Sequence, residues 1–526
     1  MESSKIRTLS WPLLLVTALS VSIGWGVRGQ FGHEYGAALA GALGGMTIAM
    51  LSGRPDWLAR VHYFAFLGAV GFGFGGAMSY MKTLAYTHSS DSMTVLYGFA
   101  CLMVLGALWA APAAAGMGLA AYLDREELTK LFVPLSAIFL AWHFDYLARP
   151  LVRQLHFLRY LGSQGFGALV ALLVVGVVVL VRRRYWGAGT LLIVSMSVGA
   201  WIGHLLLIQL AHLDMNPPRG DTWAGNVGIV GGILFFCWRR KLGGVAFATL
   251  GGLLLGGIGF TLGAAVKLTV MRSGFDTNWH SVLEQTQGFL LGTALAVTMG
   301  LLARRAPPLT DEPRTRRWTE VFSVTFVLCL LTYLNLRRSP GEWTKEISTL
   351  KPEIYGIRIN GDFIFSRGFL GWLDMVFLAI AIAMVLLLVV HLRRRLPFIP
   401  ETWMGKAQLF YLVFVWTTVT INFMDVLPRF TPIRLVTEWF ITINAAACTV
   451  LLVLGCFLRE GRTPVPAKDA PYGLWLRRLV AVGLLGWILV PFAGWSVKRA
   501  LWGDKFAGAI YDDQIRFGPN NTNHQR

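Results

Sequence analysis

Residues 165–181 read GFGALVALLVVGVVVLV, and Arg182, Arg183 and Arg184 follow directly. A run of this length without a charged residue can cross the hydrocarbon core of a bilayer as a helix. A basic block at the end of such a run is typical of a cytoplasmic loop, because Lys and Arg are enriched on that side of a membrane. The stretch therefore predicts a membrane-spanning helix whose C-terminal end faces the cytoplasm.

The same pattern recurs along the whole chain. Of its 526 residues, 55% are hydrophobic and only 14% are charged, which excludes a water-soluble protein and a disordered one. The predicted fold class is an all-α integral membrane protein with about 14–15 transmembrane helices. The apolar runs lie at residues 10–27, 36–52, 62–81, 94–122, 130–148, 165–181, 187–211, 224–238, 243–267, 284–303, 318–336, 368–392, 407–424, 436–458 and 477–497.

The basic residues indicate how the chain is oriented. The net charge is +19, but Lys and Arg are concentrated in short blocks between apolar runs, as at 239–241, 304–305 and 393–395. Short loops of this kind determine topology, and they predict a cytoplasmic N-terminus. No polar segment is long enough to form a nucleic-acid groove, so we expect no nucleic-acid partner. We expect a multi-pass protein of the plasma (inner) membrane of a bacterium, with membrane lipid around it.

Ordered matches between two parts of the chain predict an internal repeat. Arg28-Gly29 recurs as Arg219-Gly220, and the basic block at 182–184 recurs at 393–395. Six spans per unit is an even number, so the two copies insert in the same orientation. The predicted domains are a first six-helix repeat at 1–186, a second at 187–396 with an extracytoplasmic loop at 337–367, and a C-terminal partial repeat and tail at 397–526, which contains about three helices.

Two parallel six-span units resemble the plan of the major facilitator transporters. The resemblance is architectural, because residues 53–60 read GRPDWLAR and do not reproduce that family's Gly-x-x-x-Asp-Arg signature. The three additional spans at the C-terminal end also depart from it.

Ionisable residues near the ends of apolar helices are the candidate functional groups, because a charge at membrane depth costs several kcal/mol unless it is paired or hydrated. Most of them lie toward the predicted outer side. The link between the first two spans is rich in glycine and carries an Arg, a His and a Glu, and the equivalent link of the second unit also carries Arg and acid. Ordinary alternatives are an Arg28–Glu34 pair and a packed histidine. The candidate substrate-binding residues are Arg28, His33, Glu34, His212, Asp214, Asn216, Arg219, Asp221, His280, Glu284, Asp374, Asp425 and Arg429.

Several chemistries have no sequence support. The five cysteines lie inside apolar runs without a Cys-x-x-Cys spacing, and neither a zinc motif nor a phosphate-binding loop is present. We therefore expect no metal and no cofactor, and we assign no catalytic residue.

Two functions fit these features. The first is a secondary transporter or flippase for an anionic or polar solute or a lipid-linked substrate, in which Arg28 and Arg219 select an anionic group and Glu34, Asp214, Glu284 or Asp374 carries a coupling proton. The second is a membrane-embedded glycosyl-, acyl- or phospho-transferase that acts on a lipid-linked substrate at the outer leaflet. In it His33, Glu34, Asp214 or His280 is the general base and the arginines hold a phosphate. Whether the chain is an enzyme stays open at this point, as does its oligomeric state. A non-catalytic scaffold is the plainest alternative.

Overall fold

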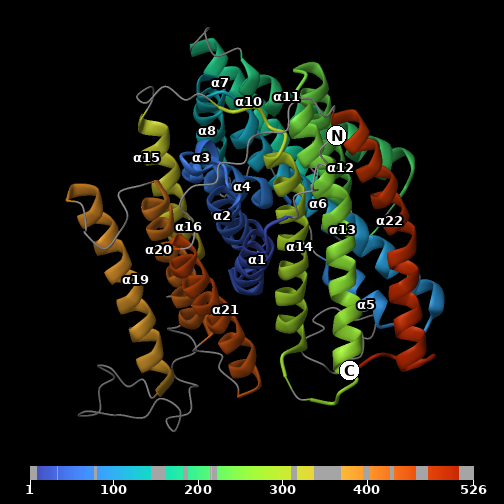
Figure 1. The fold of residues 1–526 in the computed structure, drawn as a ribbon. Helices are drawn as coiled ribbons and strands as arrows, with labels where there is room; N and C mark the ends of the chain where they lie inside the picture. The colour runs from blue at the N-terminus through green and yellow to red at the C-terminus, as the bar shows by residue number, and fades with distance from the viewer. Residues whose placement is uncertain are drawn as a thin grey trace, which may run out of the picture.

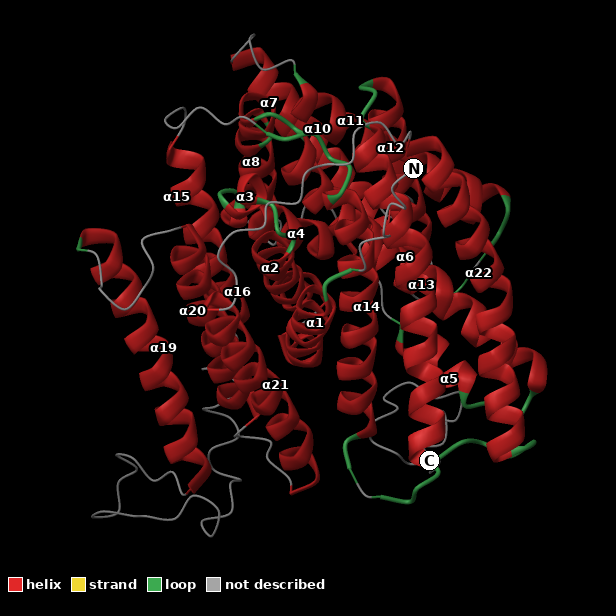
Figure 2. Cartoon of the chain, in the orientation of Figure 1, coloured by secondary structure: helices red, strands yellow, loops and turns green. Residues whose placement is uncertain are grey.

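The computed structural model describes most of the chain. The residues that it describes are 9–31, 33–75, 80–143, 162–181, 187–213, 215, 222–275, 277–309, 317–336, 369–394, 403–426, 432–457 and 472–508. Figure 2 shows that this described part consists of helices and loops, without a strand. An all-helical fold is what a bilayer requires, because a helix satisfies its own backbone hydrogen bonds where no water is present.

The helices follow the apolar runs of the sequence, and every run predicted above overlaps at least one of them (Figure 1). They are α1 (Trp11–Phe31), α2 (His33–Leu51), α3 (Pro55–Leu58), α4 (Val61–Gly75), α5 (Met81–Thr87), α6 (Ser92–Tyr122), α7 (Arg125–Lys130), α8 (Phe132–His143), α10 (Gly162–Val181), α11 (Ala188–His204), the π-helix η3 (Leu205–Leu210), α12 (Thr222–Arg239), α13 (Gly243–Met271), α14 (Trp279–Ala303), α15 (Arg317–Thr325), the π-helix η4 (Phe326–Leu330), α16 (Leu331–Leu336), α19 (Phe369–Arg393), α20 (Trp403–Val426), α21 (Pro432–Phe457) and α22 (Tyr472–Trp502).

Many of these helices can span a membrane. Within the described ranges, nine helical segments have the length and apolar composition to do so, and shorter apolar helices lie at 35–51, 61–75, 165–181 and 378–391. The chain is therefore a polytopic membrane protein. The predicted total of 14–15 spans, the two repeats and the three domains remain predictions, and the predicted loop at 337–367 lies outside the described residues.

Helix α1 packs against both α2 and α14, and close contacts at small residues set the direction of each pair. An added Cβ at Gly24 would lie 2.4 Å from the Cα of Ala40, so α2 runs back along α1. On the other side of α1, a Cβ at Gly292 would lie 2.7 Å from the carbonyl oxygen of Thr17, and one at Gly288 would lie 2.8 Å from the Cα of Ser22. Small residues allow such backbone approach in membrane helices. The antiparallel arrangement brings the end of α1 beside the beginning of α14.

Helices α6 and α13 pack against α14. Trp109 on α6 and Phe260 on α13 both contact the ring of Trp25 on α1, with centroid distances of 4.9 and 6.0 Å. Helix α22 lies on the outer side of α13, where Figure 1 draws it in red at the edge of the bundle. Apolar side chains on α22 such as Val482 and Ile488 are exposed, as expected for a helix surface that faces lipid.

Candidate functional site

Arg28 and Glu284 form a buried ion pair where α1 ends and α14 begins. The Arg28 Nη2 atom lies 2.7 Å from Glu284 Oε1, and the two side chains are only 2% and 4% exposed. Arg28 is in the last turn of α1, and Glu284 is in the second turn of α14. Both charges have lost their hydration, and burying a charge is costly unless a partner compensates it. A buried pair inside a membrane protein is therefore a candidate functional site.

Tyr80, which immediately precedes α5, connects the two charged groups. Its hydroxyl oxygen accepts a hydrogen bond from Arg28 Nη2 at 2.8 Å, and its hydroxyl group donates one to Glu284 Oε1 at 2.8 Å. The carboxylate oxygen thus receives hydrogen bonds from two groups at once.

His280 lies one helical turn before Glu284 and is the most exposed member of the cluster. Its Nε2 atom is 3.4 Å from Glu284 Oε1, and its side chain is 22% exposed, compared with 4% for Glu284. Its Nδ1 atom has no hydrogen-bond partner within the described part of the chain. His280 is therefore the member of the cluster that is most accessible from outside the protein interior, and it lies beside the buried carboxylate.

Aromatic rings surround the guanidinium group. The Cζ atom of Arg28 lies 4.7 Å from the ring centroid of Trp25, 5.0 Å from that of Tyr80 and 5.5 Å from that of Trp109. A guanidinium is attracted to the face of an aromatic ring, most strongly where water is absent. The rings thus supply apolar walls and hold the Arg28 side chain in place.

Contacts between backbones and neighbouring helices position Glu284. An added Cβ at Gly29 would lie 2.5 Å from Glu284 Oε2, so a larger residue there would displace the carboxylate. One residue after Glu284, the Gln285 side chain donates to the Thr437 carbonyl on α21 at 3.0 Å, and the Gln285 carbonyl accepts from Ser22 on α1 at 2.8 Å. These bonds fix the first turns of α14 against α1 and α21.

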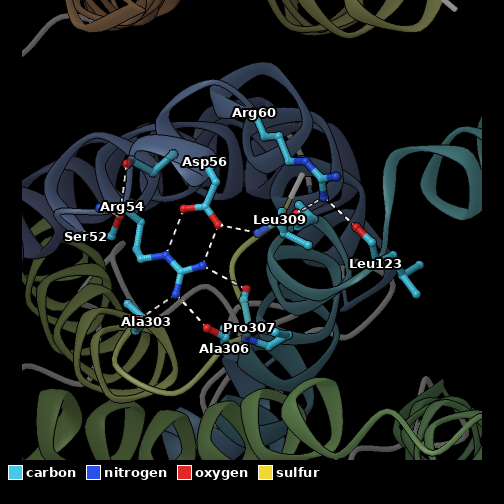
Figure 3. A network of polar contacts seen from close by, with 11 residues as sticks. Ser52, Arg54, Asp56, Arg60, Leu123, Ala303, Ala306, Pro307 and Leu309 are labelled. Atoms are coloured by element: carbon cyan, nitrogen blue, oxygen red, sulfur yellow. Dashed lines mark hydrogen bonds and ion pairs between the residues drawn. The ribbon is translucent and has the colours of Figure 1, made fainter. Parts of the chain in front are cut away.

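A second polar network lies at the other end of α14 (Figure 3). Arg54 donates from Nε and Nη2 to the two carboxylate oxygens of Asp56 at 2.8 and 2.5 Å, and from Nη1 to the Ala306 carbonyl at 2.6 Å. Asp56 in turn accepts from the backbone amide of Leu309 at 3.0 Å. Burial opposes ionisation of Asp56, but the bonds from Arg54 and Leu309 prevail and lower the pKa of its carboxyl. The network joins the α2–α3 connection to the segment after α14.

The structure brings together three of the predicted site residues, namely Arg28, His280 and Glu284. His212 is described but exposed, and its backbone has a positive φ of 52° after η3. His204, eight residues earlier, has its Nε2 atom 3.3 Å from Gln209 Nε2. The remaining predicted residues are not tested. The side chains of His33, Glu34, Asp374 and Asp425 lie outside the described part although their backbones are in helices, and Asp214, Asn216, Arg219, Asp221 and Arg429 lie outside it altogether.

Sequence reasoning did not select Tyr80, Trp25 and Trp109 as site residues. Trp25 and Trp109 lie inside apolar runs, where a tryptophan is normally a packing or interfacial residue. Tyr80 offered a weak signal, since it follows a glycine-rich stretch and is a polar residue near the end of a predicted span.

No group of three His, Cys, Asp or Glu side chains in the described ranges is arranged to hold a metal ion. No family model, no curated protein and no solved structure matches the chain.

Proposed function

We propose that the chain is a proton-coupled secondary transporter for an anionic solute or for the anionic head group of a lipid-linked substrate. The observation that carries this proposal is the buried Arg28–Glu284 pair, which is bridged by Tyr80 and flanked by the partly exposed His280. A cation, a carboxylate and a partly exposed imidazole within hydrogen-bonding reach are the groups that anion binding and proton exchange require.

In this mechanism Glu284 carries the coupling proton and Arg28 binds the anion. While Glu284 is ionised, it occupies Arg28 at 2.7 Å. A proton that arrives through His280 neutralises the carboxylate and leaves the guanidinium available to a substrate anion. Because Arg28 is buried, the protein disfavours a state in which it lacks both partners. Proton binding and anion binding are thereby linked.

The position of the pair fits alternating access. Arg28 belongs to the first predicted unit (1–186) and Glu284 to the second (187–396), so a rocking motion between the units would separate the two residues. The Arg54 network joins the same two units at the other end of α14. With a cytoplasmic N-terminus, which is part of the proposal, the Arg28 site opens toward the outside of a bacterial inner membrane, and the Arg54 network closes the cytoplasmic side.

One observation favours a second candidate function, a transferase that acts at the outer leaflet. His280 Nε2 lies 3.4 Å from Glu284, and its Nδ1 atom has no hydrogen-bond partner in the described ranges. A histidine oriented by a carboxylate is a common general base. In that case Arg28 would hold a phosphate of a lipid-linked substrate.

The test reconstitutes the purified chain in proteoliposomes with an inwardly directed proton gradient. Uptake of labelled mono- and dicarboxylates, phosphate esters and sulfonates is measured for the wild type, for Arg28→Gln and for Arg240→Gln as a surface control. We expect gradient-driven uptake of at least one anion, its loss in Arg28→Gln, and normal uptake in Arg240→Gln. Gradient-independent turnover of a lipid-linked donor, with no uptake of any solute, would support the transferase instead.

A further inference from the structure

The hydrogen-bond donors around Glu284 form an oxyanion site that the protein fills with its own carboxylate. Glu284 Oε1 receives Arg28 Nη2 at 2.7 Å and the Tyr80 hydroxyl at 2.8 Å, and His280 Nε2 lies 3.4 Å away. Arginine carries five N–H donors in a planar fork that matches carboxylate and phosphate oxygens. Arg28 thus supplies the positive charge and Tyr80 a further donor that an oxyanion can use.

The walls of the site restrict what can enter. Trp25 and Trp109 are fully buried and flank the guanidinium group, and Phe260 lies 5.2 Å from the ring of Tyr80. In addition, the indole N–H groups of Trp25 and Trp109 have no acceptor within the described part of the chain. A buried donor without an acceptor costs free energy.

We infer, on the basis of the proposed transport function, that the substrate carries a compact oxyanion group that replaces the Glu284 carboxylate on Arg28 and Tyr80 when Glu284 takes up a proton. The exchange is electroneutral within the site. One proton binds a Glu284 oxygen, and the negatively charged group of the substrate binds Arg28. The buried guanidinium therefore keeps a counter-ion throughout. The proton comes from water through His280, so an N–H bond of the protonated imidazole breaks as the O–H bond of Glu284 forms, and no other covalent bond changes.

The groups that face Glu284 support assigning the proton to it. The titratable side chains in contact with it in the described part are Arg28 on α1, Tyr80 before α5 and His280 on α14 itself. Among the other helices that pack against α14, α6 carries no acidic or basic residue, and the only charged residue in α13 is Lys267. Helix α2 begins with His33 and Glu34, and α21 carries Arg434; these three side chains lie outside the described part. On α21, Glu438 accepts a hydrogen bond from Asn422.

Anion binding to the full chain in detergent micelles tests the inference. The probes are acetate and sulfate, whose charges do not change between pH 6 and pH 8, and a short-chain phosphatidic acid as a lipid head group. Binding is measured by calorimetry and by the shift of the melting temperature. For the wild type, uptake of one proton with the anion predicts an affinity that falls about tenfold per pH unit over this range. In Glu284→Gln, which keeps an amide oxygen for Arg28, we expect tighter binding at pH 8 that no longer depends on pH.

Each probe has a decisive result. Binding of acetate or sulfate identifies a free solute, whereas binding of phosphatidic acid alone identifies a lipid head group. An affinity of the wild type that is the same at pH 6 and pH 8 would overturn the exchange, whether or not Glu284→Gln folds. A folded Glu284→Gln that binds less tightly than the wild type at pH 8 would overturn it as well. Arg28→Gln is the matched control and should bind none of the probes.

The transport assay separates this inference from the function on which it rests. Anion binding with the expected pH dependence but without gradient-driven uptake would contradict transport and leave the oxyanion site standing. Uptake of an anion that continues to depend on the proton gradient in Glu284→Gln would contradict the exchange and leave transport standing.

Discussion

Arg28 and Glu284 lie 256 residues apart in the chain, yet their side chains are joined at 2.7 Å inside the helical bundle. The pair depends on the antiparallel packing of α1 on α14, which the close approaches at Gly288 and Gly292 make possible. His280 Nε2 also lies 3.4 Å from the buried carboxylate, so the residues that stabilise the fold here are the ones that the proposed function uses.

Replacing one member of the Arg28–Glu284 pair should lower the free energy of unfolding, because the other charge stays buried without this partner. Arg28→Gln and Glu284→Gln each leave a buried charge without its partner, at a cost of about 3–5 kcal/mol. The double variant removes both charges, so we expect it to lose less than the sum of the two single effects. Unfolding of each variant in mixed micelles, measured by circular dichroism, provides the double-mutant cycle. Strictly additive losses would show that the two side chains are not coupled.

Tyr80→Phe should weaken the cluster without changing its shape. The substitution removes the hydroxyl group that bonds Arg28 and Glu284, both of which are charged, so we expect a loss of about 1.5–3 kcal/mol. Tyr411→Phe is the matched control, since the buried Tyr411 hydroxyl lies 2.6 Å from the neutral Ser20 hydroxyl. That control should lose about 1 kcal/mol. Equal melting temperatures for the two variants would argue against a charge-assisted role for Tyr80.

Two glycines in helices should respond in opposite ways to alanine. At Gly41 on α2, an added Cβ would lie 2.1 Å from the backbone oxygen of Gly68 on α4, so Gly41→Ala must push the two helices apart and should cost about 1–3 kcal/mol. At Gly231 on α12 an added Cβ meets nothing within 4 Å, and Gly231→Ala should be neutral or slightly stabilising because alanine favours helix. Melting temperatures of the two variants check the difference.

The protein should lose stability as the pH falls below the ordinary pKa of histidine, partly because of His88. This residue follows α5, is fully buried, and donates from Nδ1 to the Ala507 carbonyl at 2.8 Å. Burial, and secondarily the charges of Lys267 and Lys498, lower the pKa of His88 from 6.5 to about 3. Between these values the unfolded chain binds a proton that the folded chain does not, so acid favours unfolding.

The variant His88→Asn keeps a donor for Ala507 but cannot be protonated. Its melting temperature should therefore fall less than that of the wild type between pH 7 and pH 4. Parallel curves for the two proteins would assign the acid sensitivity to other groups.

The orientation of α13 offers a direct test of the topology. Lys241 lies in the connection before α13, and Phe275, which is 57% exposed, lies in the connection after it. If the basic block at 239–241 is cytoplasmic, a membrane-impermeant maleimide should label Phe275→Cys in intact cells and Lys241→Cys only after the membrane is opened. The reverse labelling would place the N-terminus outside.

Local sequence features predicted the class of the protein and the positions of its helices. An apolar run such as 165–181 has one outcome in a bilayer, because only a helix satisfies the backbone hydrogen bonds there, and α10 follows that run closely. The same reasoning picked out Arg28, His280 and Glu284, because charged and polar side chains at the ends of apolar helices are rare and costly.

The sequence did not predict which of these residues meet. It suggested Glu34 as a partner of Arg28, on the basis of proximity in the chain. The described structure shows Glu284 as a partner, and adds Tyr80 and two tryptophans that resemble ordinary packing residues in the sequence.

The sequence by itself determined that the chain is a helical membrane protein with few charges at depth, since hydrophobicity and charge are read residue by residue. Only the tertiary structure decided that Arg28, Tyr80, His280 and Glu284 form one site. Their meeting depends on close approaches between helices, such as that of Gly29 to Glu284, and such approaches leave no periodic signal in the sequence.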